Sequence, residues 1–280
     1  PYARSTPLFY YNKDMWEAAG LPDRGPETWE EWDEDFAPKL AEANPDVTPL
    51  VIPDGSLYMD WYFQGMVWSM GGAYSKDYTM TMSSPETIKA GEFLQSQFEQ
   101  GYFKAVKEAT APFVSGQGAA MLESTGSLNG VAEDGKINLG TAFLPSPEGV
   151  VGCPTGGAGV GIPAKSENKE AAAKFLAFLT SPENTVKFSQ GTGYMPVRIS
   201  ATELPEEQAY FEENPNFKTA VEQLEFTQKQ DAGRVYVSGG GMRIGAALDK
   251  IAQGADVAET FKQIDEEQQA IIDSDIKPKL

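Results

Sequence analysis

The sequence predicts an α/β fold, because short apolar strands alternate with amphipathic helices along the chain. The alternation starts at the N-terminal end, where the apolar run 8–11 leads into a short helix that Asn12 can cap and Gly20 can end. The chain has 280 residues, of which 41% are hydrophobic. This length and composition allow one large core or two modest cores.

Local start signals place the next elements of the first half. Thr28 and Glu31 form a capping box, and the aromatic residues that follow at helical spacing predict a helix of about three turns. Ser84 before Pro85 opens a second helix, since Ser is a favoured N-cap and Pro a favoured first helical residue. Strands are expected at 47–52, 119–122 and 137–144.

The second half continues the same alternation and then becomes helical. Residues 145–149 form the best internal linker by composition. A Gly-rich strand is expected over 155–162, followed by an amphipathic helix around Phe175 and Leu176. Ser181 marks the start of another helix. Further helices are expected at 203–213, 215–227, 240–253 and 255–272.

Composition excludes several classes of function. The net charge of −19 argues against nucleic acid and anionic membranes as partners, because both attract basic faces. The chain has no histidine and a single cysteine, Cys153, which excludes Ser-His-Asp and Cys-His catalysis, His-ligated metal sites and an internal disulfide. We therefore expect no metal and no cofactor. No apolar run approaches the roughly 20 residues of a membrane-spanning helix, and the first residues show no secretory signal.

Several stretches match one protein family in the same order along the chain. The first is 10–21, with Tyr-Tyr-Asn-Lys-Asp followed by Ala-Gly-Leu, and the others lie at 165–172, 192–198 and 254–260. In this pattern the chain resembles the extracytoplasmic solute-binding proteins of ABC importers, the maltose-binding-protein-like family 1. The resemblance extends over essentially the whole sequence.

The resemblance implies a periplasmic-binding-protein-like, two-lobed (Venus-flytrap) fold. Residues 1–143 are expected to form the first part of the C-terminal lobe, with a crossover near 1–8. Residues 150–197 are expected to be a returning segment of the N-terminal lobe, and 200–280 the helical tail of the C-terminal lobe. In the family the opening motif follows a whole lobe segment. We therefore expect the chain to begin in the middle of its fold and to lack the first part of the N-terminal lobe.

Within the family, four features favour the glycerol-3-phosphate-binding subgroup. They are Ser-Thr-Pro at 5–7, the run 124–128, Gly-Gly-Ala at 156–158, and 210–215 followed by Thr-Ala at 219–220. The resemblance implies a non-enzymatic, substrate-binding component of an ABC importer. It would capture sn-glycerol 3-phosphate or a glycerophosphodiester and deliver it to membrane permease subunits. It would be a monomer outside the cytoplasm, periplasmic or lipid-anchored, with its signal peptide not in this chain.

Two segments offer backbone groups to a ligand. Residues Ser124 to Ser127 stand at a strand end before a helix, where N–H groups and hydroxyls can hold anionic oxygens, although a plain N-cap is the commoner role. Gly157, beside Gly156, permits close approach of a ligand to the backbone, and a bulge in a strand is equally consistent. The resemblance favours ligand binding for Ser124 and Gly157, with Ser127 as an alternate.

Two arginines compete for the role of phosphate ligand. Arg234 and Arg243 are the basic residues of the Gly-rich region around 233–241, and the resemblance implies a phosphate-contacting arginine at one of them. Arg243 fits better because it precedes the helix 244–251, and Arg234 is the alternate. A guanidinium can bind phosphate through two hydrogen bonds, which lysine cannot. The competing interpretation is a surface ion pair, worth about 0–1 kcal/mol.

Hydroxyl and aromatic side chains complete the candidate set. Tyr194 and Ser5 can each offer a hydroxyl to a ligand, and each can equally pack a hinge between lobes. The aromatic residues from 58 to 68 can stack on a sugar or face an ammonium group, whereas core packing is their commoner role. We expect Trp61 or its neighbour Leu57 to touch the ligand, with Tyr58 as an alternate.

Three other functions compete with glycerol phosphate binding. A neutral oligosaccharide is the alternative ligand in the same fold, and a tryptophan platform with carboxylates would favour it. A secreted glycan-active enzyme needs two carboxylates, but pairs such as Asp33 and Asp35 arise by chance among 41 acidic residues. A purely structural surface protein would bind no small molecule.

Overall fold

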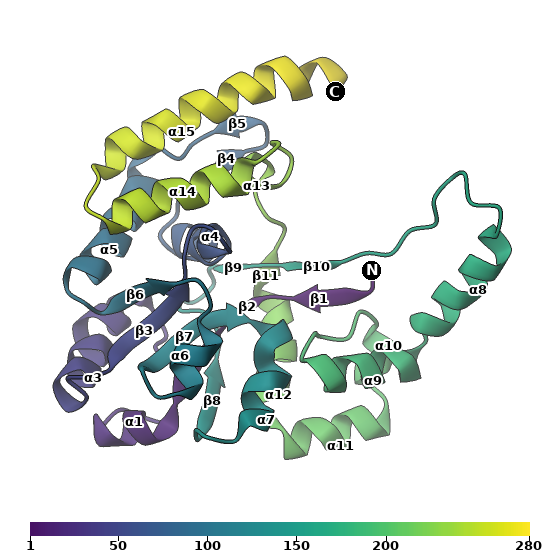
Figure 1. The fold of residues 1–280 in the computed structure, drawn as a ribbon, viewed down its shortest axis with the longest axis horizontal. Helices are drawn as coiled ribbons and strands as arrows, with labels where there is room; N and C mark the ends of the chain where they lie inside the picture. Colours follow the sequence, from purple (N-terminus) through teal and green to yellow (C-terminus); the bar gives the residue numbers. More distant parts are fainter.

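The computed structural model describes all residues from Pro1 to Leu280. A five-stranded sheet lies at its centre in the order β6-β3-β7-β2-β8 (Figure 1). Strands β6, β3 and β7 run parallel, whereas β2 pairs antiparallel with both β7 and β8. The strand bounds are β2 Pro7–Asn12, β3 Thr48–Pro53, β6 Phe103–Val106, β7 Gly118–Ser124 and β8 Leu139–Ala142. The sheet confirms the α/β class and the four strands expected at 8–11, 47–52, 119–122 and 137–144, and it adds β6.

Both faces of the sheet are buried, and successive side chains of a strand enter two separate cores. In β2, Phe9 and Tyr11 belong to the larger core, whereas Leu8 and Tyr10 belong to the smaller one. In β3, Val51 enters the smaller core and its two neighbours the larger. A strand that is covered on both faces has no polar side to expose. This explains why the sequence of β2 is a continuous apolar run and does not alternate between apolar and polar residues.

Helices from both ends of the chain cover the larger core. Trp16 and Trp32 are buried in it, and both rings pack edge-on against the ring of Phe9 in β2. Helices α4, α5, α14 and α15 pack together above the sheet (Figure 1). The bounds of the segments on this side are α1 Lys13–Ala18, α2 Trp29–Glu31, η1 Trp32–Phe36, α3 Ala37–Ala43, α4 Met59–Ser69, α5 Pro85–Glu99, α14 Gly240–Ala252, α15 Val257–Ile271, η4 Ile272–Ile276 and η5 Lys277–Lys279.

Shorter helices cover the smaller core. Phe113 from α6, Val131 from α7 and Phe217 from α12 are buried there against Tyr10 and Met121 of the sheet. The bounds of the segments on this side are α6 Thr110–Val114, η2 Thr125–Ser127, α7 Leu128–Asp134, α11 Pro205–Glu213, α12 Pro215–Glu222 and η3 Gln223–Phe226. The helix expected over 215–227 is therefore shorter and ends in a 3-10 turn.

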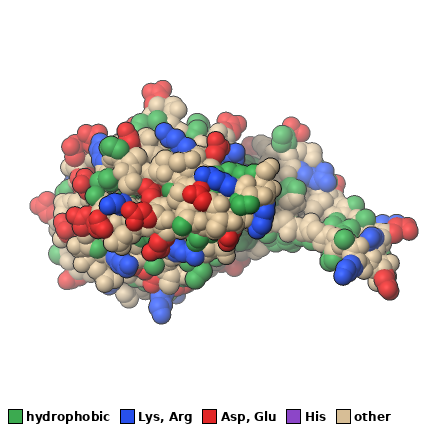
Figure 2. All heavy atoms as spheres, turned by 90° about the horizontal axis from the view of Figure 1, so that it is seen from above, with side chains coloured by type: hydrophobic (Ala, Val, Ile, Leu, Met, Phe, Trp, Pro, Cys, Tyr) green, Lys and Arg blue, Asp and Glu red, His purple; other side chains and the backbone are tan.

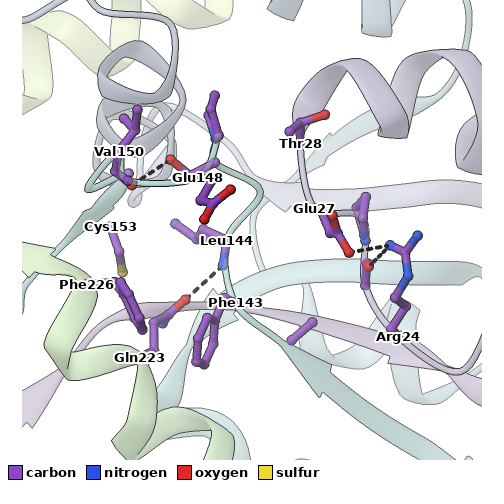
Figure 3. A pocket seen from close by; sticks show the side chains of 17 residues that line it. Arg24, Glu27, Thr28, Phe143, Leu144, Glu148, Val150, Cys153, Gln223 and Phe226 are labelled. Atoms are coloured by element: carbon purple, nitrogen blue, oxygen red, sulfur yellow. Dashed lines mark hydrogen bonds and ion pairs between the residues drawn. The ribbon is translucent and has the colours of Figure 1, made fainter.

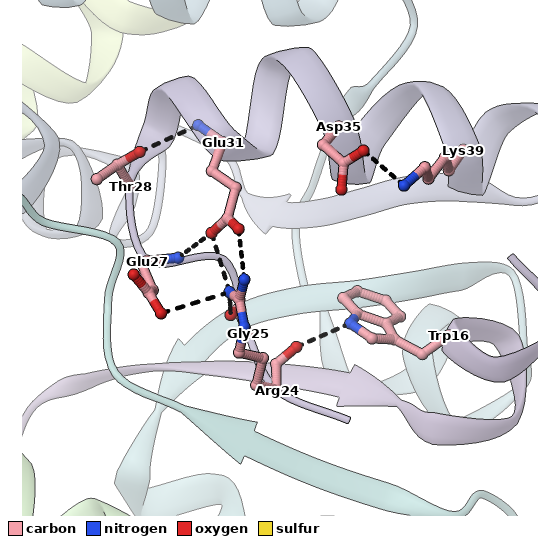
Figure 4. A network of polar contacts seen from close by, with 8 residues as sticks. All are labelled: Trp16, Arg24, Gly25, Glu27, Thr28, Glu31, Asp35 and Lys39. Carbon is pink, nitrogen blue, oxygen red and sulfur yellow. Dashed lines mark hydrogen bonds and ion pairs between the residues drawn. The ribbon is translucent and has the colours of Figure 1, made fainter. Parts of the chain in front are cut away.

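The aromatic helix begins at the capping box that the sequence predicts. The Thr28 hydroxyl accepts from the Glu31 N–H at 3.0 Å, while the Glu31 carboxylate accepts from the Glu27 N–H and forms an ion pair with Arg24 (Figure 4). The helix then widens into the π-helical segment η1, which the spacing did not predict. The caps predicted at Asn12, Ser84 and Ser181 are also observed, each accepting backbone N–H bonds.

Residues 155–180 extend away from the main body as an arm, whereas Cys153 before it lies in the larger core and Met195 after it lies in the smaller core (Figures 1 and 2). Strand β9 Cys153–Pro154 pairs with β11 Thr227–Gln228, and β10 Gly156–Ala158 pairs with β1 Ala3–Ser5. The strand expected over 155–162 ends at Ala158. Its antiparallel partner β1 begins at Ala3, which lies opposite Ala158, so the pairing ends at these two residues. The arm ends in α8 Lys169–Leu179, which has no buried residue. The chain then returns through α9 Pro182–Thr192, which packs against α7, and through α10 Ile199–Thr202.

The remaining elements are short. Strands β4 Ser75–Lys76 and β5 Thr79–Met80 form a hairpin, and α13 Ala232–Val235 precedes α14. Acidic side chains are spread over the surface of the main body (Figure 2). None of the helices has the length and apolar character needed to cross a membrane.

Two glycines test how tightly the helices pack. A Cβ at Gly91 in α5 would lie 2.5 Å from Val257 and 2.6 Å from Phe261 of α15, whereas a Cβ at Gly130 in α7 would meet no atom within 4 Å. We expect Gly91→Ala to destabilise the protein by about 1–3 kcal/mol through overpacking. Gly130→Ala should stabilise it by up to about 1 kcal/mol through helix propensity. Urea unfolding followed by circular dichroism measures both; equal stabilities would contradict the described contact between α5 and α15.

Candidate ligand-binding site

A cavity of about 470 Å³ lies where the end of β7 meets the β1–β10 ribbon and the start of α4. It brings together eight of the ten predicted or alternate site residues: Ser5, Tyr58, Trp61, Ser124, Ser127, Gly157, Tyr194 and Arg234. The structure adds five further lining residues: Glu123, Gly126, Gly156, Ala158 and Gln230. Leu57 and Arg243 lie outside it.

Ser124 caps the short turn that follows β7. Its hydroxyl oxygen accepts from the Gly126 N–H at 3.1 Å, and its carbonyl accepts from the Tyr10 hydroxyl at 2.7 Å. The plain N-cap role is therefore observed. The same bond leaves the Ser124 hydroxyl proton free to donate into the cavity.

Gly156 and Gly157 form a wall of bare backbone. Gly157 has φ +131°, and a Cβ there would lie 2.1 Å from the Ala3 carbonyl oxygen. A Cβ at Gly156 would lie 2.9 Å from both the Ser5 hydroxyl and the Trp61 ring. Close approach of strand β1 and of Trp61 therefore requires both glycines. The same absence of side chains leaves the backbone of β10 accessible from the cavity.

The two arginines have different surroundings. The Arg234 Nε donates to the Asp60 carboxylate at 2.6 Å, and its Nη1 donates to the Gln230 side-chain oxygen, while Nη2 has no protein partner. Arg243 instead folds back on the turn before α14 and donates to the Ser238 carbonyl at 2.6 Å. The preference for Arg243 over Arg234 is not supported by this placement, since the Arg243 guanidinium is bound to the backbone of its own turn.

Aromatic side chains form the upper wall. Trp61 is only 5% exposed and packs in the core, yet its ring edge lines the cavity, and its Nε1–H is buried without a hydrogen-bond partner. Tyr58 is 55% exposed, and its ring centroid lies 6.4 Å from that of Trp61. Leu57 is exposed and does not line the cavity. On the opposite side, Tyr194 stacks on Phe188 with ring centroids 5.9 Å apart.

Glu123 is the lining residue whose chemistry the sequence analysis missed. One of its carboxylate oxygens accepts from the Ser124 N–H at 2.7 Å and from the Tyr62 hydroxyl at 2.9 Å. Burial raises the pKa of the Glu123 carboxyl, and these hydrogen bonds oppose the rise. Its position could have indicated a role in the site, because Glu123 directly precedes the turn 124–127 that was expected to bind a phosphate. Across the described chain, no group of three or more His, Cys, Asp or Glu side chains is placed to hold a metal ion.

A second cavity, of about 460 Å³, lies between the Arg24–Thr28 segment, the loop after β8 and Phe226 (Figure 3). Its main donors are already paired: Arg24 forms ion pairs with Glu27 and Glu31, and Ser146 donates to the Val150 carbonyl at 3.0 Å (Figure 3). Gln223 also accepts from the Leu144 N–H at 2.8 Å. No predicted site residue lines it. Because a polar ligand needs unpaired donors and acceptors, the first cavity is the better candidate.

The Glu123 carboxyl makes the free energy of unfolding of the protein depend on pH. Its pKa is higher in the folded chain, so the folded state loses stability as pH rises through that pKa. We therefore expect Glu123→Gln to raise the melting temperature at neutral pH, and this gain to vanish below the usual glutamate pKa of about 4.3. Thermal unfolding at both pH values is the measurement, with the exposed Glu42→Gln as control. A gain of equal size at both pH values would argue against a desolvated carboxylate.

Comparison with known proteins identifies the family. The family model for bacterial extracellular solute-binding proteins matches residues 1–219. The sn-glycerol-3-phosphate-binding periplasmic protein UgpB of Salmonella typhimurium is 32% identical over 239 residues, which are 80% of this chain and 54% of that protein. The chain thus spans about half the length of the curated relatives it matches.

Solved structures agree with the sequence relatives. The crystal structure of UgpB from Mycobacterium tuberculosis in complex with glycerophosphocholine is 44% identical, with a TM-score of 0.93 over 99% of this chain and 71% of that one. The GacH receptor of Streptomyces glaucescens shares the fold, with a TM-score of 0.82 at 19% identity over 98% of this chain and 71% of that one. The chain therefore belongs to the bacterial extracellular solute-binding protein family, and its α/β fold is that of the maltose-binding-protein-like members.

Proposed function

We propose that this protein is the solute receptor of an ABC importer, which captures sn-glycerol 3-phosphate or a glycerophosphodiester and delivers it to a membrane permease. The observation that carries this proposal is the cavity in which the Arg234 Nη2 group has no protein partner. The hydroxyls of Ser5, Ser127 and Tyr194 line the same cavity and bond to no protein acceptor. A guanidinium with several convergent hydroxyls is a suitable environment for a phosphate group.

The names of the relatives support the same ligand class. One relative is named for binding sn-glycerol 3-phosphate, and another was crystallised with glycerophosphocholine. The two compounds share a glycerol phosphate unit, which the donors around Arg234 would recognise. The exposed face of Tyr58 and the ring of Trp61 would then contact the rest of the ligand, including a cationic headgroup through cation–π attraction.

A neutral oligosaccharide is the second candidate. Glu123 and the Tyr58–Trp61 ring pair favour it, since carboxylates bind sugar hydroxyls and aromatic rings stack on sugars. Catalysis on glycans is a weaker candidate, because Glu123 is the cavity's single carboxylate and a glycosidase needs two. Asp33 and Asp35 lie on η1, where they bond to Gln97 and Lys39 outside the cavity. We therefore propose binding without turnover.

The arm fits a role in a second lobe. We propose that residues 1–143 and 200–280 belong to the C-terminal lobe, and that 150–197 are a returning segment of the N-terminal lobe. Phe175 and Phe178 of α8 are 59% and 63% exposed, which is the surface that such a lobe would cover. The family is extracellular and its relatives are periplasmic. A monomeric protein in the periplasm, or anchored to the cell surface by lipid, is the corresponding proposal.

Calorimetry distinguishes the ligand classes. We expect sn-glycerol 3-phosphate or glycerophosphocholine to bind with a Kd of ~1 μM, near −8 kcal/mol, because the phosphate replaces water on donors that are already converged. Maltose and a longer maltooligosaccharide serve as controls and should give no binding heat. Oligosaccharide binding without any response to glycerol phosphates would refute the proposal.

A pair of arginine variants tests which guanidinium binds the phosphate. Arg234→Ala removes the cavity's single cation and should weaken binding by about 1.5–3 kcal/mol or more. Arg243→Ala removes a guanidinium that is bound to the turn at Ser238 and should leave the affinity unchanged. Calorimetric titration of both variants with the same ligand makes the comparison. The reverse order of effects would restore the preference for Arg243.

A further inference from the structure

Arg234 and Glu123 line the same cavity, yet no ion pair joins them. Arg234 is the single Lys or Arg of the lining, and Glu123 is the single acidic residue. Opposite charges that share a cavity attract one another, and a long arginine side chain can adopt several rotamers. The other contacts of the guanidinium therefore decide whether it stays apart from Glu123.

The first of these contacts is a second carboxylate, which lies behind the arginine. Asp60 is 2% exposed, and its Oδ2 accepts from the Arg234 Nε at 2.6 Å. Arg234 is the only cation with which Asp60 pairs. A buried carboxylate and a guanidinium in hydrogen-bond contact hold one another firmly, because separating them leaves an uncompensated buried charge.

The surroundings leave Asp60 little freedom. It is the second residue of α4. Burial raises the pKa of its carboxyl, and Arg234 and the backbone N–H groups of that first turn oppose the rise. Its carbonyl accepts from the Tyr74 hydroxyl at 2.7 Å. A Cβ at Gly241 in the first turn of α14 would lie 2.6 Å from Oδ2, so the carboxylate fills the space that this glycine leaves. Asp60 is therefore a fixed anchor between two helices.

Gln230 holds a second edge of the guanidinium. Its side-chain oxygen accepts from the Arg234 Nη1, and its Nε2 donates to the Thr155 carbonyl at 2.7 Å. The second bond orients the amide so that its oxygen faces the arginine. With Nε and Nη1 occupied, Nη2 is the end that remains for a ligand.

We propose that Asp60 is the positioning residue for Arg234: it holds the guanidinium away from Glu123, so that the cavity keeps a separate cation and anion for its ligand. This inference rests on the proposed function, since it assumes that Arg234 binds the phosphate. Holding the side chain in advance lowers the conformational entropy lost on binding. Without Asp60, the guanidinium pairs with Glu123 and the phosphate must compete with that carboxylate.

Calorimetry with glycerophosphocholine and sn-glycerol 3-phosphate tests this role. Asp60→Asn keeps the shape of the side chain but removes its charge, and we expect it to weaken binding about tenfold. In an Arg234→Ala background the same change should have no further effect, because the group that it positions is absent. Asp249→Asn is the matched control: this carboxylate accepts from the Gly55 N–H at 2.8 Å and lies outside the cavity.

Calorimetry on Gln230→Ala, alone and combined with Arg234→Ala, tests the positioning of Arg234 independently of Asp60. Gln230→Ala alters the same guanidinium from a partly exposed position, so it tests the positioning role even if Asp60→Asn fails to fold. It should weaken binding several-fold, again without effect in the Arg234→Ala background. An unchanged or tighter affinity in Asp60→Asn, or equal losses with and without Arg234, would overturn the positioning role. Absence of binding by the wild type would instead refute the proposed function on which it rests.

Discussion

One continuous stretch of backbone, Ala3 to Asn12, belongs to two sheets and joins the arm to the main body. Strand β1 pairs with β10 of the arm, and β2, one residue later, pairs with β7 and β8 in the middle of the main sheet. The Gln223 side chain bonds the junction through the Thr6 hydroxyl and the Pro7 carbonyl, at 2.8 and 2.7 Å. Because β2 is buried on both faces, it cannot shift its register without exposing one core. The arm is therefore attached at a fixed point of the main body.

The cavity follows from that attachment. Ser5 ends β1 beside the last residues of β7, so the strand that links the arm to the sheet also forms the floor of the site. The bare backbone of Gly156 and Gly157 lets β10 and Trp61 approach closely. Charge is added from a separate part of the chain, because Arg234 reaches the cavity from the segment before α14 and is paired there with Asp60 of α4. Backbone attachment thus sets the shape of the site, and a long-range ion pair sets its electrostatics.

Much of the fold could be predicted because its signals are local. The caps at Thr28, Ser84 and Ser181 act within a few residues, and the structure contains each of them. Most of the candidate site residues line one cavity, although they come from segments far apart in the sequence. Their convergence was expected from the family resemblance and not from local signals. The sequence favoured Arg243 over Arg234, but it gave no sign that the Arg243 guanidinium folds back on the turn at 238–239. The short strand β6 and the end of β10 were missed because each depends on a partner distant in sequence.

We propose that the Arg234 guanidinium, held by Asp60, is the phosphate-binding group of the cavity. A crystal structure of the protein grown with sn-glycerol 3-phosphate or glycerophosphocholine would show where the phosphate lies. We expect phosphate density within hydrogen-bond distance of the Arg234 Nη2, with the Asp60 contact intact and Glu123 unpaired with the arginine. Phosphate bound at Arg243, or ligand density confined to the cavity beside Phe226, would contradict it.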